Sequence, residues 1–278
     1  MPEVSVIIGT YNAEKYIKET ILSVFNQTFK DFELIVVDDG STDNTVRIIE
    51  DMIKPPHKLV IQKNQGEAGS RNTGLKIASG RYISFLDHDD LYSPVKLEKL
   101  KKFLDENKEF AMVYANQDYI ITYGSGNNWI NWSFAAENNG SGDIFIKQFI
   151  ENKIHIITTM IKRECFEKTG EFDRTMNYAS DSDMWIRVSA NYRIGYLNES
   201  LAYYRLHSTN ESLDRETCLI HRIASMNKNY RLFNDRVKGN KEILKAIRGL
   251  YYRLIKLYIK RGEYKTAWKY FKEFQSAR

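Results

Sequence analysis

Short apolar runs alternate with helix-like stretches through the first hundred residues of the chain. The runs are rich in the β-branched and aromatic residues of buried strands, and they cover residues 4–8, 32–37, 59–62 and 82–86. Between them, apolar residues recur at the spacing of one helix face, most clearly in residues 13–27. Strands joined by helices require right-handed crossovers. The sequence therefore predicts an α/β fold with a Rossmann-like, mostly parallel sheet flanked by helices.

Polar side chains follow three of these predicted strands. In chain order they are Thr10, Tyr11 and Asn12, then Asp38 and Asp39, then Asp87, His88, Asp89 and Asp90. The carboxyl ends of parallel strands meet at one edge of a sheet, and ligands of such sheets bind there. We therefore expect these side chains to form a single site.

The last of these clusters places three carboxylates, Asp87, Asp89 and Asp90, within four positions. Such crowding of like charges is unfavourable unless a cation lies between them. Carboxylate oxygens suit Mg²⁺ or Mn²⁺, whose coordination is often completed by substrate phosphates. This cluster predicts a metal and a nucleotide diphosphate. The alternative is a loop in which one Asp caps the helix starting near Ser93 and the others are solvated.

Two common nucleotide-binding motifs are missing from the sequence. It has neither the Gly-x-Gly-x-x-Gly of dinucleotide-binding proteins after the first strand nor a Gly-x-x-x-x-Gly-Lys-Ser/Thr loop. The segment 64–72 offers Gly66, Gly69 and Arg71 before a helix, an arrangement that could bind phosphate. Alternatively, the two glycines are turn residues only.

Four segments together resemble family 2 glycosyltransferases of the GT-A fold. They are residues 4–12, 33–43, 64–72 and 85–90, and the last holds the Asp-x-Asp sequence. The resemblance is clear over residues 3–100 and thinner to about residue 210. Gly9 stands where the family usually has Pro before Thr-Tyr-Asn.

The resemblance implies a role for each residue at the strand ends. Thr10, Tyr11 and Asp39 would hold a uracil-type base, with Asn12 and Asp38 beside them. Gly69 and Arg71 would contact the base or the phosphates, and Asp87 would contact the ribose. His88 would occupy a variable, exposed position. Asp89 and Asp90 would bind Mn²⁺ or Mg²⁺.

Two segments in the second half extend the resemblance. Asp181 aligns with the general base of the family, although Ser180 replaces the usual Glu before it. In the alternative interpretation, Asp181 and Asp183 cap the helix that follows. Arg205 and His207 lie in a segment similar to one that closes over the nucleotide, where they could contact the diphosphate or the metal.

These features divide the chain into a catalytic domain, residues 1–212, and a helical C-terminal extension, residues 213–278. Within the catalytic domain, we expect residues 1–100 to form the nucleotide-binding half and residues 101–212 the acceptor half. The acceptor half contains predicted strands at 111–114 and 156–162 and a predicted mobile flap at 127–142. The net charge of +5 is uneven, because residues 238–278 carry 12 Lys and Arg against 3 Asp and Glu.

The extension predicts two amphipathic helices. One apolar stripe contains Ile243, Ile247, Leu250, Leu254, Leu257 and Tyr258, and a second contains Tyr264, Ala267, Trp268 and Phe271. Such a pair must pack on the catalytic domain, on another subunit or on anionic lipid. We expect homo-oligomers through these helices and a peripheral contact with the inner membrane face. Nucleic acid is not expected, because no nucleic-acid motif accompanies the charge.

The compartment follows from what the chain lacks. There is no signal-peptide pattern and no run of 18 apolar residues, and Cys165 and Cys218 cannot make a disulfide framework. We therefore expect a cytoplasmic protein.

Together these observations predict a metal-dependent, inverting glycosyltransferase. It would move a sugar from a nucleotide donor, UDP-linked by the resemblance, to a hydroxyl of a glycan, glycolipid or glycoprotein. The rival hypothesis is a non-catalytic scaffold of the same fold in a glycosylation complex, which would have no use for clustered carboxylates. A nucleotidyltransferase is disfavoured because residues 9–12 do not form a Gly-rich, basic loop.

Overall fold

The computed structural model describes residues 1–121, 140–208 and 210–276. Over these residues the chain forms an eight-stranded sheet in the order β3-β2-β1-β4-β7-β6-β8-β5. The strands are β1 Val4–Thr10, β2 Phe32–Asp38, β3 Lys58–Ile61, β4 Tyr82–Asp87, β5 Leu91–Tyr92, β6 Phe110–Ile121, β7 Thr159–Lys162 and β8 Arg193–Leu206. The α-helices are α1 Ile17–Phe25, α2 Thr45–Met52, α3 Gly66–Ile77, α4 Lys96–Glu106, α5 Phe145–Ile150, α6 Cys165–Thr169, α7 Ser180–Asn191, α8 Arg215–Leu232, α9 Asn234–Val237, α10 Lys241–Lys260 and α11 Tyr264–Ser276.

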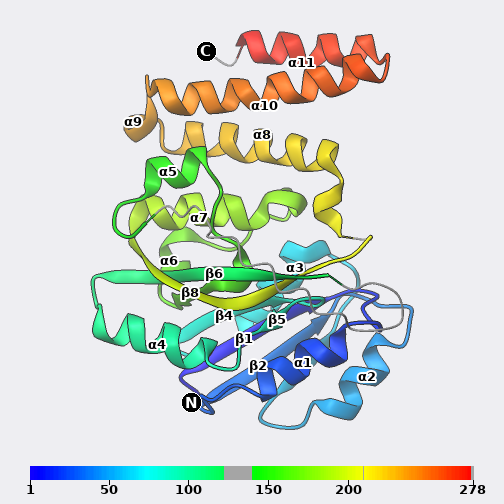
Figure 1. Ribbon diagram of the computed structural model, residues 1–278, viewed down its shortest axis with the longest axis vertical. Coiled ribbons are helices and arrows are strands. Elements are labelled where there is room, and N and C mark those ends of the chain that lie inside the picture. Colours follow the sequence, from blue (N-terminus) through cyan, green and yellow to red (C-terminus); the bar gives the residue numbers. More distant parts are fainter. Residues whose placement is uncertain (122–139, 209, 277–278) are drawn as a thin grey trace.

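The sheet is mostly parallel, as the sequence predicts. Strands β3, β2, β1 and β4 run parallel, β7 pairs antiparallel with β4 and β6, and β8 is parallel to β6. Figure 1 shows the sheet in the lower half of the molecule and helices α8, α10 and α11 stacked above it. The carboxyl ends of β1, β2 and β4 therefore share one edge, and the site is built there.

Local predictions were wrong in several places. Helix α1 begins at Ile17, because Ala13 lies in a turn whose N–H donates to Thr45 Oγ1 at 2.7 Å. Residues 156–158, predicted as strand, form a 3₁₀ turn before β7. Strand β6 extends well beyond residue 114, and β8 was not identified. Both long strands are stabilised by pairing with each other across a large sequence separation, which local periodicity does not reveal. The predicted flap lies almost wholly outside the described residues.

The extension packs on the catalytic part of the chain through a second hydrophobic core. Phe145 and Phe149 of α5 and Ile186 of α7 pack there against Met226 of α8 and Ile247 of α10. The inner stripe of α10 is therefore covered by the catalytic part of the same chain. Of the three expected arrangements, this is the one in which the extension packs on the catalytic domain. The described residues of the extension, 213–276, share their core with residues before position 212.

The predicted stripe of α11 is only partly correct. Ala267 is buried and Phe271 is half-buried, whereas Tyr264 and Trp268 are 69% and 57% exposed. All four residues lie on one stripe of the helix, and Tyr264 and Trp268 are at its solvent-facing edge, where the Trp268 ring stacks on that of Phe271. No helix in the described residues is long and apolar enough to cross a bilayer.

Candidate active site

A cavity of about 860 Å³ opens at the carboxyl ends of β1, β2 and β4. The predicted residues that line it are Thr10, Tyr11, Asn12, Asp39, Arg71, Asp87, His88, Asp89, Asp181 and His207. The structure thus brings together side chains separated by almost two hundred residues in the sequence. Asp38, Gly69, Asp90 and Arg205 do not line it.

Asp38 and Gly69 shape the loops around the cavity. The Asp38 carboxylate accepts hydrogen bonds from the Ser41 hydroxyl at 2.5 Å and from the Gly40 and Ser41 amides at 3.1 and 2.9 Å. Those bonds fix the turn after β2. Gly69 lies in the first turns of α3, where an added Cβ would lie 2.5 Å from that of Gln65. Both residues therefore have structural roles that the sequence pattern did not distinguish from ligand contacts.

One end of the cavity is formed by Thr10 and Asp39. Asp39 accepts hydrogen bonds from Gln62 Nε2 at 2.7 Å and from the Gln65 and Gly66 amides at 2.9 and 2.8 Å, so it fixes the start of α3. Thr10 is 2% exposed, and its buried hydroxyl has no hydrogen-bond partner among the described residues. An unsatisfied buried hydroxyl is unusual in a folded protein.

Arg71 connects three elements at the centre of the site. Its guanidinium donates to Asp87 Oδ1 at 2.7 Å and to Ser180 Oγ at 3.1 Å, and it is paired with Glu67. Burial would lower the pKa of Arg71, but the carboxylates of Glu67, Asp87 and Asp181 raise it above the usual value. Arg71 is thus a permanent cation that joins the end of β4 to the start of α7. Ser180, which replaces the Glu usual in the family, accepts one of its hydrogen bonds.

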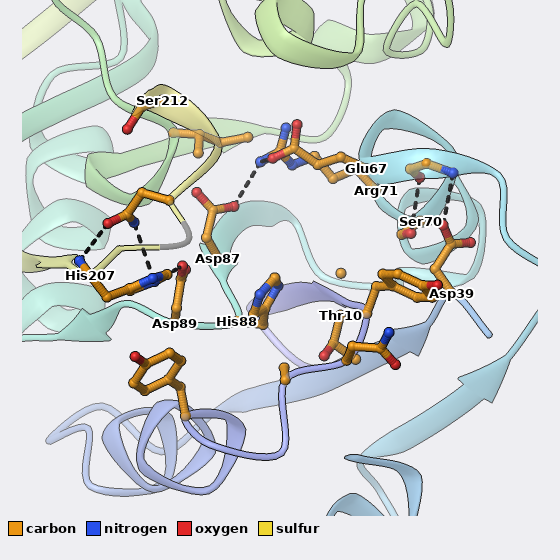
Figure 2. A pocket seen from close by; sticks show the side chains of 18 of the residues that line it. Thr10, Asp39, Glu67, Ser70, Arg71, Asp87, His88, Asp89, His207 and Ser212 are labelled. Atoms are coloured by element: carbon orange, nitrogen blue, oxygen red, sulfur yellow. Dashed lines mark hydrogen bonds and ion pairs between the residues drawn. The ribbon is translucent and has the colours of Figure 1, made fainter. Parts of the chain in front are cut away.

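Asp89 and His207 are two cavity side chains whose donor atoms suit a divalent cation. His207 Nε2 lies 2.9 Å from Asp89 Oδ2, and Figure 2 shows the two side chains pointing toward each other. Burial would raise the pKa of Asp89, but the hydrogen bond from His207 and the nearby His88 lower it, so the carboxylate is ionised. One carboxylate oxygen and one imidazole nitrogen suit Mn²⁺ better than Mg²⁺, which prefers oxygen.

The protein supplies few ligands for such a cation. No group of three or more His, Cys, Asp or Glu that could hold a metal is found in the part of the chain that the structure describes. Two protein ligands fit a cation whose other ligands come from a diphosphate and water. The residues present therefore fit a catalytic metal that arrives with its nucleotide.

Asp90, predicted as a second metal ligand, points away from the cavity. It is fully buried, and its Oδ1 accepts a hydrogen bond from the Arg205 amide at 2.7 Å. Its Oδ2 has no hydrogen-bond partner among the described residues. Burial and the neighbouring Asp89 and Asp87 raise its pKa well above the usual value. Asp90 therefore holds β8 against the end of β4 through its hydrogen bond with the Arg205 amide.

Arg205 packs behind Asp89 and His207. It is 1% exposed, and its Nε donates to the Asp89 carbonyl at 2.7 Å while Nη2 donates to Glu19 at 2.7 Å. The guanidinium also lies 4.9 Å from the ring of Tyr16, on which His207 stacks. Arg205 does not line the cavity, and its side chain is engaged by Asp89, Glu19 and Tyr16, so a direct contact with a diphosphate stays a prediction.

Asp181 and Asp183 occupy different environments on α7. Asp181 lines the cavity, and burial raises its pKa although Arg71 opposes the shift. Asp183 is fully buried and binds Arg187, Lys228 and Asn229. Neither side chain is the N-cap of α7, which is Ala179. Asp181 Oδ1 nevertheless accepts a hydrogen bond from the Ser182 amide in the first turn of α7 at 2.5 Å.

Some cavity residues were missed by the sequence analysis. The cavity is also lined by Tyr178, Tyr204, Ser212 and Cys218. Ser212 and Cys218 lie at and beyond the predicted boundary of the extension. No motif marks them, and only the packing of α8 on α7 brings them to the site.

A family model described as "Glycosyl transferase family 2" matches residues 5–170. An uncharacterized glycosyltransferase of Methanocaldococcus jannaschii is 32% identical over 220 residues, which cover 77% of this chain and 74% of that protein. Another, from Haemophilus influenzae, is 32% identical over 224 residues, covering 76% of this chain and 68% of the other.

Solved structures share the fold. S. aureus TarS 1–349 in complex with UDP-GlcNAc superposes with a TM-score of 0.63 at 19% identity, covering 98% of this chain and 92% of that one. The mannosyltransferase PcManGT from Pyrobaculum calidifontis, in complex with GDP-Man and Mn²⁺, gives 0.66 at 21% identity, with coverage of 100% and 76%. The GT-A arrangement expected from the sequence is therefore confirmed.

Proposed function

The chain belongs to glycosyl transferase family 2 and is a glycosyltransferase, for which we propose a specific reaction. It transfers a sugar from a UDP-linked donor to a hydroxyl of a glycan, glycolipid or glycoprotein acceptor, with a divalent cation and with inversion. The observation that carries the proposal is the convergence in one cavity of the Asp89–His207 pair, Arg71 and Asp181.

The donor is held by the strand ends. The Thr10 hydroxyl and the exposed Tyr11 ring bind the base, and Asp87 lies where a ribose would follow. Asp89 and His207 would hold Mn²⁺, which supplies positive charge to the departing diphosphate. Two nucleotide-bound structures of this fold, one with UDP-GlcNAc and one with GDP-Man and Mn²⁺, support a donor and a cation of these classes.

Asp181 acts as the general base. An acceptor hydroxyl has a pKa far above neutrality and must lose its proton as it attacks the anomeric carbon. A carboxylate whose pKa is raised by burial accepts that proton more readily than an ordinary one. Direct attack by this hydroxyl displaces the nucleotide in one step, and inversion follows.

The test separates donor binding from catalysis. Wild-type protein with Mn²⁺ and a panel of UDP-sugars should bind a donor by titration calorimetry and release UDP, slowly to water or faster with a saccharide acceptor. Asp181→Asn should bind the donor as wild type does and lose about 10²–10⁴-fold in UDP release. Binding without turnover by wild type would favour a scaffold, and binding of GDP-sugars alone would replace the UDP assignment.

A further inference from the structure

We propose that the outer face of α11 binds the surface of a membrane that contains anionic phospholipids. This α11 face consists of Tyr264, Lys265, Trp268, Lys269 and Lys272. The spacing i, i+1, i+4, i+5, i+8 places all five on one side of the helix. The inference adds a partner to the proposed glycosyltransferase and does not depend on its donor or acceptor.

The α11 face exposes aromatic surface that the core does not need. Ala267, on the inward flank of α11, is 5% exposed and already packs this helix against the rest of the chain. Tyr264 and Trp268 are nevertheless 69% and 57% exposed. The Lys272 Nζ lies 5.9 Å from the Trp268 ring, so a cation and an indole share the same patch. Exposed aromatic rings in a group are a signature of an interaction surface.

The charge of this region is predominantly positive, although Glu242 and Glu263 are exposed and Glu273 is half-buried. The α11 face contains no carboxylate, and the exposed side of α10 adds Lys245, Arg248, Arg253, Lys256 and Lys260. Within the described part of the chain, these five side chains make no ion pair. A partner must therefore supply negative charge together with an apolar layer.

Anionic phospholipid supplies both. Trp and Tyr rings lie at the headgroup level of bilayers, and Lys side chains pair with lipid phosphates. A second copy fits less well, because two-fold pairing of α11 faces would bring lysines against lysines. Figure 1 shows α11 as the outermost layer of the helical stack, far from the sheet whose strand ends carry the cavity. Contact through α11 would leave that cavity open to substrates.

The test is co-sedimentation of the full chain with two kinds of vesicle, phosphatidylcholine alone and phosphatidylcholine mixed with phosphatidylglycerol. Binding should occur to the mixed vesicles and weaken as NaCl rises. Lys265→Glu combined with Lys269→Glu should weaken it at least about tenfold. The matched control, Lys18→Glu with Lys54→Glu, makes the same change in net charge on exposed residues of the catalytic part and should bind as wild type does.

A second pair of variants tests the aromatic contribution. Trp268→Ser should weaken binding to the mixed vesicles, whereas Leu232→Ser, at an equally exposed apolar position of α8, should not. Thermal melts confirm that each variant is folded. The proposal is overturned if mixed vesicles do not bind wild type at low salt, or if the control variants weaken binding equally. Concentration-dependent dimers or oligonucleotide binding through the α11 face, without vesicle binding, would also overturn it.

Discussion

The Lys228 ammonium lies 2.9 Å from Asp183 Oδ1 and 2.8 Å from Asp173 Oδ2. This contact joins α8, the first long helix of the extension, to α7, the helix that presents Asp181 to the cavity. Asp183 is fully buried, and its other hydrogen bonds come from Arg187 and Asn229. The extension therefore helps to fix the position of the proposed general base.

Removing the Lys228 charge should destabilise the protein. Lys228→Met leaves the buried Asp183 carboxylate with one cation fewer, and we expect the free energy of unfolding in urea to fall by about 2–4 kcal/mol. The matched variant is Lys76→Met, which breaks the exposed pair between Lys76 and Glu171. It should change the free energy by less than about 1 kcal/mol. Equal losses in the two variants would show that burial of Asp183 does not matter.

The two neighbouring aspartates at the end of β4 should respond differently to the same substitution. Asp89→Asn removes a proposed metal ligand and should weaken Mn²⁺-dependent UDP binding at least about tenfold, measured by titration calorimetry with and without EDTA. Asp90→Asn keeps an oxygen for the Arg205 amide and should bind UDP as wild type does. If only Asp90→Asn weakened UDP binding, Asp90 rather than Asp89 would be the metal ligand.

A glycine in α3 should not tolerate alanine, although alanine is the better helix former. A Cβ at Gly74 would lie 2.5 Å from Ile7 Cγ2 on β1, so Gly74→Ala should lower the free energy of unfolding by about 1–3 kcal/mol. At Gly249 of α10 an added Cβ meets no atom within 4 Å. Gly249→Ala should therefore stabilise by up to about 1 kcal/mol. Stabilisation by both would mean that α3 can move away from the sheet.

Glu33 should make stability depend on pH in the acid range. Its carboxylate accepts hydrogen bonds from Lys58, Ser5 and Ser79. Burial opposes ionisation, but these bonds outweigh it and lower the pKa from 4.5 to about 2. Because the folded pKa lies below the ordinary value, the stabilisation is complete above pH 4.5 and disappears as the pH falls toward 2.

The variant that measures this effect is Glu33→Gln. Near neutral pH it should be less stable than wild type by on the order of 3 kcal/mol, and the difference should shrink between pH 4.5 and 2 in urea titrations. Glu106→Gln, at a carboxylate that is 62% exposed, is the control and should show no comparable change. A difference for Glu33→Gln that stays constant down to pH 2 would contradict the prediction.

Much of the nucleotide-binding half could be predicted from the sequence. The strands β1, β2, β3 and β4 and the helices between them follow from local periodicity, which reports on neighbours only a few residues away. Because parallel strands share an edge, the positions of Thr10, Asp39, Asp87 and Asp89 follow from the order of elements alone. The long strand β8 could not be predicted, since its partner β6 lies about eighty residues earlier in the chain.

The sequence by itself determined which residues reach the strand ends, and the tertiary structure decided which of them face the cavity. Asp89 and Asp90 are adjacent, yet one meets His207 and the other the Arg205 amide. The direction of a side chain after a strand depends on the turn and on distant partners, and these are absent from the local pattern. The outward side of α11 was decided in the same way, because only the packing of α10 and α11 shows which side remains for solvent.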